Sequence, residues 1–521
     1  MPDMSAQRII IVGAGIGGLA AAMRLAAEGC DVTVLESQDS PGGKLRTLPS
    51  AAGPVDTGPT VLTLRGVFEA LFAEAGQSLS DHATLTAEPV LARHFWPDGT
   101  TLDLFTDEEA SAAAIDGFAG ATAARQFRAF AARARRLFDR FEGPILRAPR
   151  PSLGAVGMAV ARDPAILRDM VPHRALGPML DGAFDDPRLA QLFARYSTYV
   201  GGTPQHSPAL LALIWEAEAA GVWRVEGGMH RLAHAMHDAA IAASARFAFG
   251  TGAAEIEVAN GRAVAVRDVH GTRHPADAVL FAGDPRALGE GLLGRGVVGA
   301  VPSRATAPRS LSAVVHAFAA TPSGPDLHHH NVFFGADRAT EFTPLARGRA
   351  PVDPTVYICA QDRGTGRSPP WLERFETIVN AAPLASLQGE TPCHTETTAL
   401  LKTRGLMLDP PPRAVTRTDP RGFATLFPGS LGALYGRSPE GTMAAFARPT
   451  AQSRIAGLFL AGGATHPGAG VPMAALSGRH AAETILNVRT SISRCLRTGI
   501  AGGMSTGSAT TRPAASRSSG S

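Results

Sequence analysis

Short apolar stretches alternate with glycines at the start of the chain. Residues 8–12 and 32–35 are apolar enough to form buried strands, and residues 17–28 carry Leu and Ala at helical spacing. This pattern predicts a strand, a glycine turn, a helix and a second strand that ends at Glu36. A unit of this kind is typical of a parallel α/β sheet.

The same criteria predict further elements along the chain. Asn260 and Gly261 separate two strand-like stretches as a hairpin turn. Pro472 follows a buried strand and a glycine-rich loop, and proline is favoured in the first turn of a helix. Helices are expected near residues 68–76, 187–221 and 229–242, and strands near 94–104, 253–258, 263–269, 276–281, 312–318, 355–360 and 458–461.

Residues 125–141 form an amphipathic segment with two possible interpretations. Its apolar face can pack into the core of a second domain. Alternatively, the segment can lie as a basic helix on an anionic membrane surface. The apolar positions are Phe127, Phe130, Ala131, Ala134, Leu137, Phe138 and Phe141, and the basic positions are Arg125, Arg128, Arg133, Arg135, Arg136 and Arg140.

The composition is that of a globular protein. The chain has 521 residues, of which 45% are apolar and 18% are charged, and its formal net charge is +3. The length predicts two or more domains, and so mild a charge gives no reason to expect a nucleic-acid partner. We find neither a secretory leader nor a run of about 18 apolar residues, so we expect a cytoplasmic protein without a membrane span.

The cysteine and histidine positions do not predict a metal site. The four cysteines are scattered and form no CxxC pair, so they predict neither a zinc site nor a disulfide framework. Such cysteine usage is typical of a reducing compartment. His328, His329 and His330 are adjacent, but three adjacent side chains cannot all face one site on a strand. We therefore expect no metal in this protein.

Three glycines and one acid in the first strand–turn–helix unit predict a dinucleotide site. Gly13 allows a tight turn, Gly15 leaves room for a pyrophosphate, and Gly18 lets the helix pack closely on the strand. The helix start directs its N–H groups at the phosphates. Glu36, 18 residues after Gly18, is placed to accept hydrogen bonds from a ribose. The alternative is a glycine-rich turn that binds no ligand.

Two further stretches carry glycines where backbone could approach a ligand. Gly42 and Gly43 precede Lys44 and Arg46, either of which could offer positive charge to a phosphate. Small residues follow at positions 55–62, with Gly58, Pro59 and Thr60 at their centre.

A third stretch lies near the C-terminus. A buried strand at 458–461 ends in Gly462 and Gly463 and leads through a glycine–proline loop to Val471, Pro472 and Met473. The helix that begins there has a partial positive charge at its start, which would stabilise an anionic ligand group. Two glycine-rich loops so far apart in the sequence suit one extended cofactor.

Together these motifs resemble the bacterial carotenoid desaturases related to phytoene desaturase, a branch of the FAD-binding amine oxidase superfamily. Residues 42–49, 434–439 and 448–450 are most similar to the 1-hydroxycarotenoid 3,4-desaturases, the hydroxyneurosporene or methoxyneurosporene desaturases. The motifs that carry the resemblance are residues 13–18 with Glu36, 42–44, 56–60, 227–229 and 461–472.

The resemblance implies an α/β fold, in which a Rossmann-like FAD-binding domain carries an inserted α+β substrate domain. The FAD-binding domain would comprise residues 1–75, 223–288 and 413–488, and the substrate domain, which faces the membrane, residues 76–222 and 289–412; residues 489–521 would be a disordered tail. FAD would be bound by Gly13, Gly15, Gly18, Glu36, Gly43, Lys44, Gly58, Pro59, Thr60, Gly462, Gly463, Val471, Pro472 and Met473.

The implied activity is FAD-dependent C3–C4 dehydrogenation of a 1-hydroxylated acyclic carotenoid such as 1-hydroxyneurosporene, by an enzyme peripherally associated with the inner membrane. FAD would take a hydride, and a long apolar tunnel would hold the substrate. No second GxGxxG follows a strand, so the electrons would leave to an external acceptor such as oxygen or a quinone. His466 is the only candidate for a catalytic side chain, and a structural role fits it equally well.

Other activities remain possible on this sequence. They are a multi-step desaturase of the phytoene or neurosporene type, an FAD-dependent carotenoid isomerase, and a prenyl-protein escort that shares the architecture but binds no flavin. A general amine oxidase is a weaker alternative, because lysine occurs only at positions 44 and 402 and neither suggests such chemistry.

Overall fold

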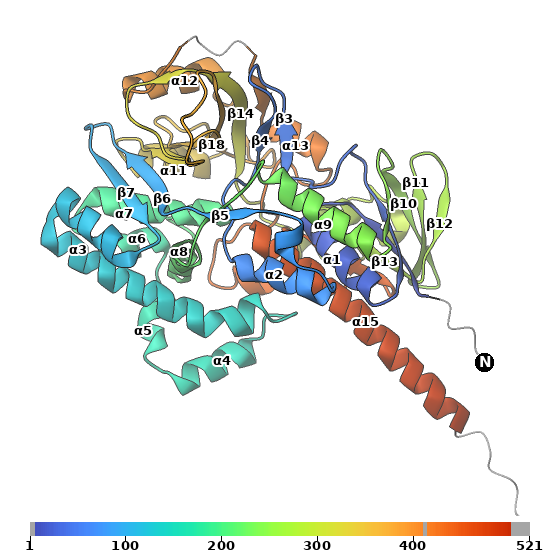
Figure 1. Ribbon diagram of the computed structural model, residues 1–521. Helices are drawn as coiled ribbons and strands as arrows, with labels where there is room; N and C mark the ends of the chain where they lie inside the picture. Colours follow the sequence, from blue (N-terminus) through green and yellow to red (C-terminus); the bar gives the residue numbers. More distant parts are fainter. Residues whose placement is uncertain (1–5, 410–413, 502–521) are drawn as a thin grey trace, which may run out of the picture.

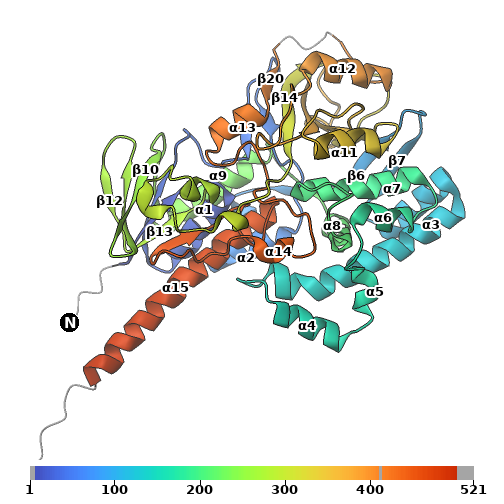
Figure 2. The same cartoon turned by 180° about the vertical axis from the view of Figure 1, so that it is seen from behind.

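The computed structural model describes residues 6–409 and 414–501, with side chains up to residue 488. Two sheets organise the described chain: a parallel five-stranded sheet and a mixed seven-stranded sheet. Figures 1 and 2 show the parallel sheet and its helices beside a second body that contains the long helix α3. The sequence prediction of an α/β fold is confirmed.

The parallel sheet is assembled from three separated parts of the chain. Its order is β21-β13-β1-β2-β9, and β1 pairs with both β2 and β13. Ile9 and Ile11 of β1 pack into one apolar core with the helices α1, α9 and α15, whereas Ile10 and Val12 pack into another core with the three-stranded sheet β10-β11-β12. Alternating side chains of a fully buried strand thus serve two layers. The elements are β1 Arg8–Val12, α1 Ile16–Ala27, β2 Asp31–Leu35, α9 His230–Ala242, β9 Arg246–Ala248, β10 Ala253–Ala259, β11 Arg262–Asp268, β12 Arg273–Pro275, β13 Ala278–Phe281, β21 Leu458–Leu460 and α15 Val471–Ala501.

The seven-stranded sheet has the order β20-β14-β18-β17-β16-β6-β7. The division into domains stays a prediction, but β20 begins beyond the expected boundary at residue 412 and pairs with β14 of this sheet. The strands are β6 Val90–Phe95, β7 Thr101–Phe105, β14 Ser312–Ala320, β16 His330–Phe333, β17 Val356–Ala360, β18 Glu373–Ala381 and β20 Thr416–Thr418. The helices of this part are α3 Glu108–Phe141, α4 Leu153–Arg162, α5 Ile166–Met170, α6 Leu176–Asp181, α7 Pro187–Ala194, α8 Leu213–Ala219, α11 Arg338–Ala346 and α12 His394–Thr403.

Shorter elements complete the two bodies. Strands β3 and β4 form one hairpin, and β5 pairs with β8 across a long stretch of sequence. The bounds are β3 Arg46–Leu48, β4 Val55–Thr57, α2 Arg65–Glu74, β5 Leu85–Ala87, β8 Trp223–Val225, α10 Arg286–Gly289, β15 Pro322–Ser323, β19 Met407–Leu408, α13 Pro420–Leu426 and α14 Ala444–Ala447.

Helix α3 decides between the two interpretations of residues 125–141. The helix begins earlier than expected, at Glu108, and is interrupted at Gly120, where φ is 86°. All seven apolar positions of the predicted face are buried. The burial places this face in the core, so the interpretation as a membrane-surface helix is wrong. Four of the arginines form ion pairs with acids at the start of α3 or in other segments. The pairs are Arg128–Glu109, Arg135–Glu108, Arg135–Glu216, Arg136–Asp169 and Arg140–Asp163.

Helix α15 corrects the expected start of the tail. The composition of residues 489–521 predicts a disordered tail, but the helix continues to Ala501. The chain has no proline or glycine between Gly478 and Gly499, so no helix breaker interrupts it. Residues 502–521 lie outside the described part of the chain.

The length and composition of the helices also bear on membrane crossing. Within the described residues, no helix combines the length and the apolar composition that a membrane span requires.

The buried face of α3 gives a first prediction. Phe127 is fully buried and contacts Phe193 and Trp215 through its ring. Replacing it in Phe127→Ala removes these contacts and leaves a cavity, so we expect the free energy of unfolding to fall by about 3–5 kcal/mol. Arg125→Ala, on the exposed face, should change it by no more than about 0.5 kcal/mol. Urea unfolding of the two variants measures the difference, and equal stabilities would contradict the assignment of the faces.

Candidate active site

One cavity brings the three predicted glycine-rich stretches together. Its volume is about 810 Å³, and its lining joins these stretches to apolar residues of the second body. Of the residues predicted to bind FAD, all except Gly18 line it. The structure therefore gathers them at one place, although their contacts with a cofactor stay a prediction. Those that line the cavity are Gly13, Gly15, Glu36, Gly43, Lys44, Gly58, Pro59, Thr60, Gly462, Gly463, Val471, Pro472 and Met473.

The turn between β1 and α1 needs glycine for different reasons at each position. Gly13 has a φ of +103°, which L side chains rarely adopt. A Cβ on Gly18 would lie 2.0 Å from the Gly13 carbonyl oxygen, so only glycine at position 18 allows the helix to come this close to the turn. Around Gly15, by contrast, no atom lies within 4 Å of an added Cβ. The helix start thus leaves open space at the point where a pyrophosphate was predicted.

Glu36 ends strand β2 at the edge of the same cavity. Its Oε2 accepts a hydrogen bond of 2.6 Å from the N–H of Ala14, and its Oε1 accepts one of 2.9 Å from the N–H of Gln38. These backbone donors fix the carboxylate beside the turn, where ligands of parallel sheets bind. The contact of Glu36 with a ribose stays a prediction.

The N-terminal and C-terminal loops touch through their backbones. A Cβ on Gly17 would lie 2.7 Å from the Cα of Gly462, and one on Gly478 would lie 2.1 Å from the Gly17 carbonyl oxygen. The N–H of Gly462 donates to the hydroxyl of Ser477 at 3.2 Å. The start of α15 is therefore fixed against α1, as a shared binding site for one extended ligand requires.

Lys44 is buried in the cavity wall but is already engaged. Its ammonium donates to the carbonyl of Leu434 and lies 5.4 Å from the ring centre of Phe427. Burial lowers the pKa of Lys44 to about 8. Arg46 donates to the hydroxyl of Thr418 at 2.7 Å. Both cations contact residues between positions 418 and 434, so the predicted contact of either with a phosphate stays a prediction.

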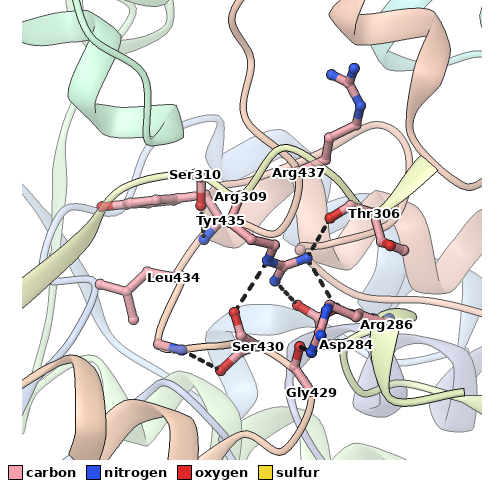
Figure 3. A network of polar contacts seen from close by, with 12 residues as sticks. Asp284, Arg286, Thr306, Arg309, Ser310, Gly429, Ser430, Leu434, Tyr435 and Arg437 are labelled. Atoms are coloured by element: carbon pink, nitrogen blue, oxygen red, sulfur yellow. Dashed lines mark hydrogen bonds and ion pairs between the residues drawn. The ribbon is translucent and has the colours of Figure 1, made fainter. Parts of the chain in front are cut away.

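An acid that the sequence analysis did not single out lies at the end of β13. Asp284 lines the cavity and forms a buried ion pair with Arg309 (Figure 3). Arg309 also donates to the carbonyls of Thr306 and Ser430, so its charge and its donors are satisfied. The available signal was the position of Asp284 at the carboxyl end of a buried parallel strand, where ligands of α/β sheets bind.

Arg448, which opens one of the stretches that carry the resemblance, holds the C-terminal loop. It is buried and donates to the carbonyls of Tyr435, Gly463 and Arg437 at 2.9, 3.2 and 2.8 Å. Burial, with Arg437 and Arg309 nearby, lowers the pKa of Arg448 to about 10, so the side chain is still a cation at neutral pH. Sequence alone offers no signal that one arginine would span two loops.

His466 does not line the cavity. Its imidazole is almost fully buried, and its Nε2 lies 2.8 Å from the carbonyl oxygen of Ala148, to which it can only donate. Burial lowers the pKa of His466 to about 4, which leaves the ring neutral at neutral pH. The geometry favours a structural link between the loop and residue 148 over proton transfer.

Of the three adjacent histidines, only His328 lies apart from the others. The ring centres of His329 and His330 are 4.6 Å apart, and the strand, with its alternation of side chains, begins only at His330. The side chain of His328 lies 3.6 Å from Asp103. His329 and His330 instead approach Cys359, which pairs with His330 on the neighbouring strand. The ligand atoms of these three residues lie within 4.8 Å of one another, and Nε2 of His329 is 3.6 Å from Sγ of Cys359. Sequence reasoning missed this cluster because Cys359 comes from a different strand.

The far part of the cavity is lined by apolar side chains. They come from the end of α3 and the residues just after it, from residues 208–217, from α13 and from the segment after α13. A ligand that enters here loses contact with water and meets few hydrogen-bonding groups. The apolar lining residues include Phe138, Phe141, Ile145, Leu146, Leu210, Leu211, Leu213, Ile214, Phe423, Leu426, Phe427 and Leu434.

The glycine turn gives a prediction for cofactor binding. Gly18→Ala places a methyl group against the Gly13 carbonyl and must displace the turn, at a cost of about 1–3 kcal/mol. We expect the Kd for FAD to rise by roughly tenfold to a hundredfold. Gly66→Ala is the control, because no atom lies within 4 Å of its added Cβ. Titration of the apoprotein with FAD measures both; equal affinities would contradict the role of the turn.

Comparison with known proteins agrees with this geometry. Residues 16–367 match the model of the family described as flavin containing amine oxidoreductase. A hydroxyneurosporene desaturase of Cereibacter sphaeroides is 52% identical over 94% of this chain and 99% of its own length. One of Rhodobacter capsulatus is 48% identical over 93% and 99%.

The fold also has solved relatives. Cyclohexylamine oxidase from Brevibacterium oxydans superposes with a TM-score of 0.56 at 16% identity, covering 93% of this chain and all of that one. The open helix start at Gly15, the acid at Glu36 and the joined loops fit FAD. The chain belongs to the flavin containing amine oxidoreductase family, in its carotenoid desaturase branch, and is an FAD-dependent oxidoreductase.

Proposed function

We propose that this protein dehydrogenates the C3–C4 bond of a 1-hydroxylated acyclic carotenoid such as 1-hydroxyneurosporene. One observation carries the proposal: the cavity lined by the FAD-binding glycines continues without a break into the apolar lining of the second body. The names and the 48–52% identity of its relatives support this substrate. A non-flavin escort protein is excluded by the membership of the family.

The reaction removes a hydride from one carbon and a proton from its neighbour, and a C=C bond forms between them. Bound FAD supplies the hydride acceptor. The chain itself has to hold the polyene and exclude water, and side chains such as Phe141, Ile214 and Leu426 provide that apolar wall. The hydride transfer needs no nucleophilic side chain of the protein, and the cavity is accordingly lined mainly by apolar groups.

The electrons leave the protein to an external acceptor such as oxygen or a quinone. A second GxGxxG occurs at Gly294, Gly296 and Gly299, but it surrounds the short 3₁₀ helix Arg295–Val297 and does not follow a strand. The described residues contain one parallel sheet with a glycine turn. A bound nicotinamide cofactor would need a further sheet of this kind.

We assign membrane contact to helices α4 and α5 instead of α3. Leu153 and Met158 of α4 are 58% and 57% exposed, and Leu167 of α5 is also exposed. Arg162 and Arg168 lie exposed beside them. Figures 1 and 2 show α4 and α5 below the body, at the same edge toward which α15 extends. This combination of apolar and basic side chains suits the cytoplasmic face of the inner membrane, where a carotenoid dissolves.

The membrane contact can be tested with paired variants. L153D/M158D replaces two exposed apolar side chains of α4, and V269D/V352D makes the same change at two exposed positions elsewhere. We expect the first to weaken partitioning onto vesicles with anionic lipid about tenfold or more, because two apolar side chains lose their burial in lipid. The second pair should bind like the wild type. Equal vesicle flotation of both pairs would disprove this docking surface.

The substrate can be tested with a panel of carotenoids. Incubation with 1-hydroxyneurosporene should give a product with one more conjugated double bond, and therefore an absorbance at longer wavelength. Phytoene should remain unchanged, and a poly-cis carotene should not isomerise. Conversion of phytoene without conversion of the hydroxylated substrate would instead favour a multi-step desaturase, and isomerisation without an acceptor would favour an isomerase.

A further inference from the structure

A charged residue lies in the wall of the otherwise apolar substrate cavity. Arg195 begins the 3₁₀ helix Arg195–Val200 (η3) and, although only 9% exposed, lines the cavity together with Thr198 and Tyr199. Its Nη2 donates to the hydroxyl of Tyr199 at 2.9 Å. Burial raises the pKa of Tyr199, so its hydroxyl keeps its proton and can donate a hydrogen bond.

A buried acid lies in the same cluster. Glu218 of α8 is 4% exposed and accepts a hydrogen bond of 2.7 Å from the hydroxyl of Tyr196. Burying charged groups costs more than burying apolar side chains of similar volume, so stability does not explain the presence of Arg195 and Glu218. Nε of Arg195 is buried and makes no hydrogen bond with the described residues. The cluster thus retains an unused donor, buried behind the residues that line the cavity.

The cluster lies beside the C-terminal FAD-binding loop. A Cβ on Gly201, just after η3, would lie 2.4 Å from the ring of Tyr435. One on Gly436 would lie 2.7 Å from the Cα of Ala464. Arg448 ties Tyr435 to Gly463 through their carbonyls. Residues 199–201, 435–436 and 463–464 are therefore neighbours across the substrate domain and the loop.

The proposed reaction requires a polar site in this position. In a 1-hydroxylated carotenoid the hydroxyl oxygen lies within roughly 4 Å of C3, given ordinary bond lengths. A group that binds this hydroxyl must therefore lie next to the atoms that react, while the rest of the polyene needs only apolar contacts. Arg195 and Tyr199 meet both conditions, since they line the cavity and adjoin the FAD-binding loop.

We propose that Arg195 and Tyr199 form the binding site for the terminal hydroxyl of the substrate and so determine its specificity. The substrate oxygen accepts hydrogen bonds from the Arg195 guanidinium and from the Tyr199 hydroxyl. The inference rests on the proposed function, because only a hydroxylated substrate uses these donors. If a carotenoid without the hydroxyl bound here, the polar groups of Arg195 and Tyr199 would be buried without a partner. The cost of such unpaired groups lets a site discriminate strongly against an analogue.

The test compares two neighbouring tyrosines of η3. Tyr199→Phe removes a hydroxyl that faces the cavity, whereas Tyr196→Phe removes one that is buried against Glu218 and does not line it. Each variant is characterised by kcat/KM for 1-hydroxyneurosporene and by the inhibition constant of neurosporene, which lacks the hydroxyl. Arg195→Lys, which keeps a positive charge beside Glu218, serves as a second variant of the site.

We expect Tyr199→Phe to lower kcat/KM for the hydroxylated substrate about tenfold, the effect of losing one hydrogen bond in a buried site. The inhibition constant of neurosporene should stay within about twofold, because its binding is apolar. Tyr196→Phe should leave the preference for 1-hydroxyneurosporene over neurosporene unchanged. Arg195→Lys should also reduce the preference for the hydroxylated carotenoid over neurosporene. A thermal melt checks that each variant is folded.

Two results would overturn the inference. If folded Tyr199→Phe and Arg195→Lys keep the preference for the hydroxylated carotenoid, these residues do not bind its hydroxyl. Equal loss for both carotenoids would show that the cluster only supports the fold. In either case wild-type turnover of 1-hydroxyneurosporene would leave the proposed function standing, whereas failure of the wild type on this substrate would remove the function itself.

Discussion

The close backbone contact between α1 and the start of α15 is the constraint on which the site depends. Gly17 and Gly462 are separated by most of the chain, yet an added Cβ on one would lie 2.7 Å from the Cα of the other. Gly478 packs against the Gly17 carbonyl in the same way. Because no side chain stands between these segments, two distant loops border a single cavity, and a cofactor of the length of FAD can contact both.

Much of this arrangement follows from local sequence signals. The strand–glycine–helix unit, the acid at Glu36 and the helix start at Val471 depend on periodicity and glycine spacing, and the structure has each of them close to its expected bounds. The resemblance to carotenoid desaturases supplied what spacing could not, namely that the loops belong to one FAD domain with a second domain inserted.

The features that sequence reasoning missed depend on long-range packing. Periodicity identified the apolar face of α3 but not what covers it, and only the structure shows it in the core with its arginines paired. Arg195 and Asp284 are single polar residues outside the motifs, and the contacts of Arg448 within its motif could not be read from spacing; each gains its role from side-chain packing in the folded chain. A buried ion pair of this kind leaves no periodic signal.

In the proposed reaction, FAD in this joined site takes a hydride from the substrate, and its electrons leave only to an external acceptor. An anaerobic reaction with 1-hydroxyneurosporene and no acceptor, in which product is counted per bound FAD, tests this directly. We expect one product per FAD, after which turnover stops until a quinone or oxygen is added. Continued turnover without an acceptor, or no product even after one is added, would contradict it.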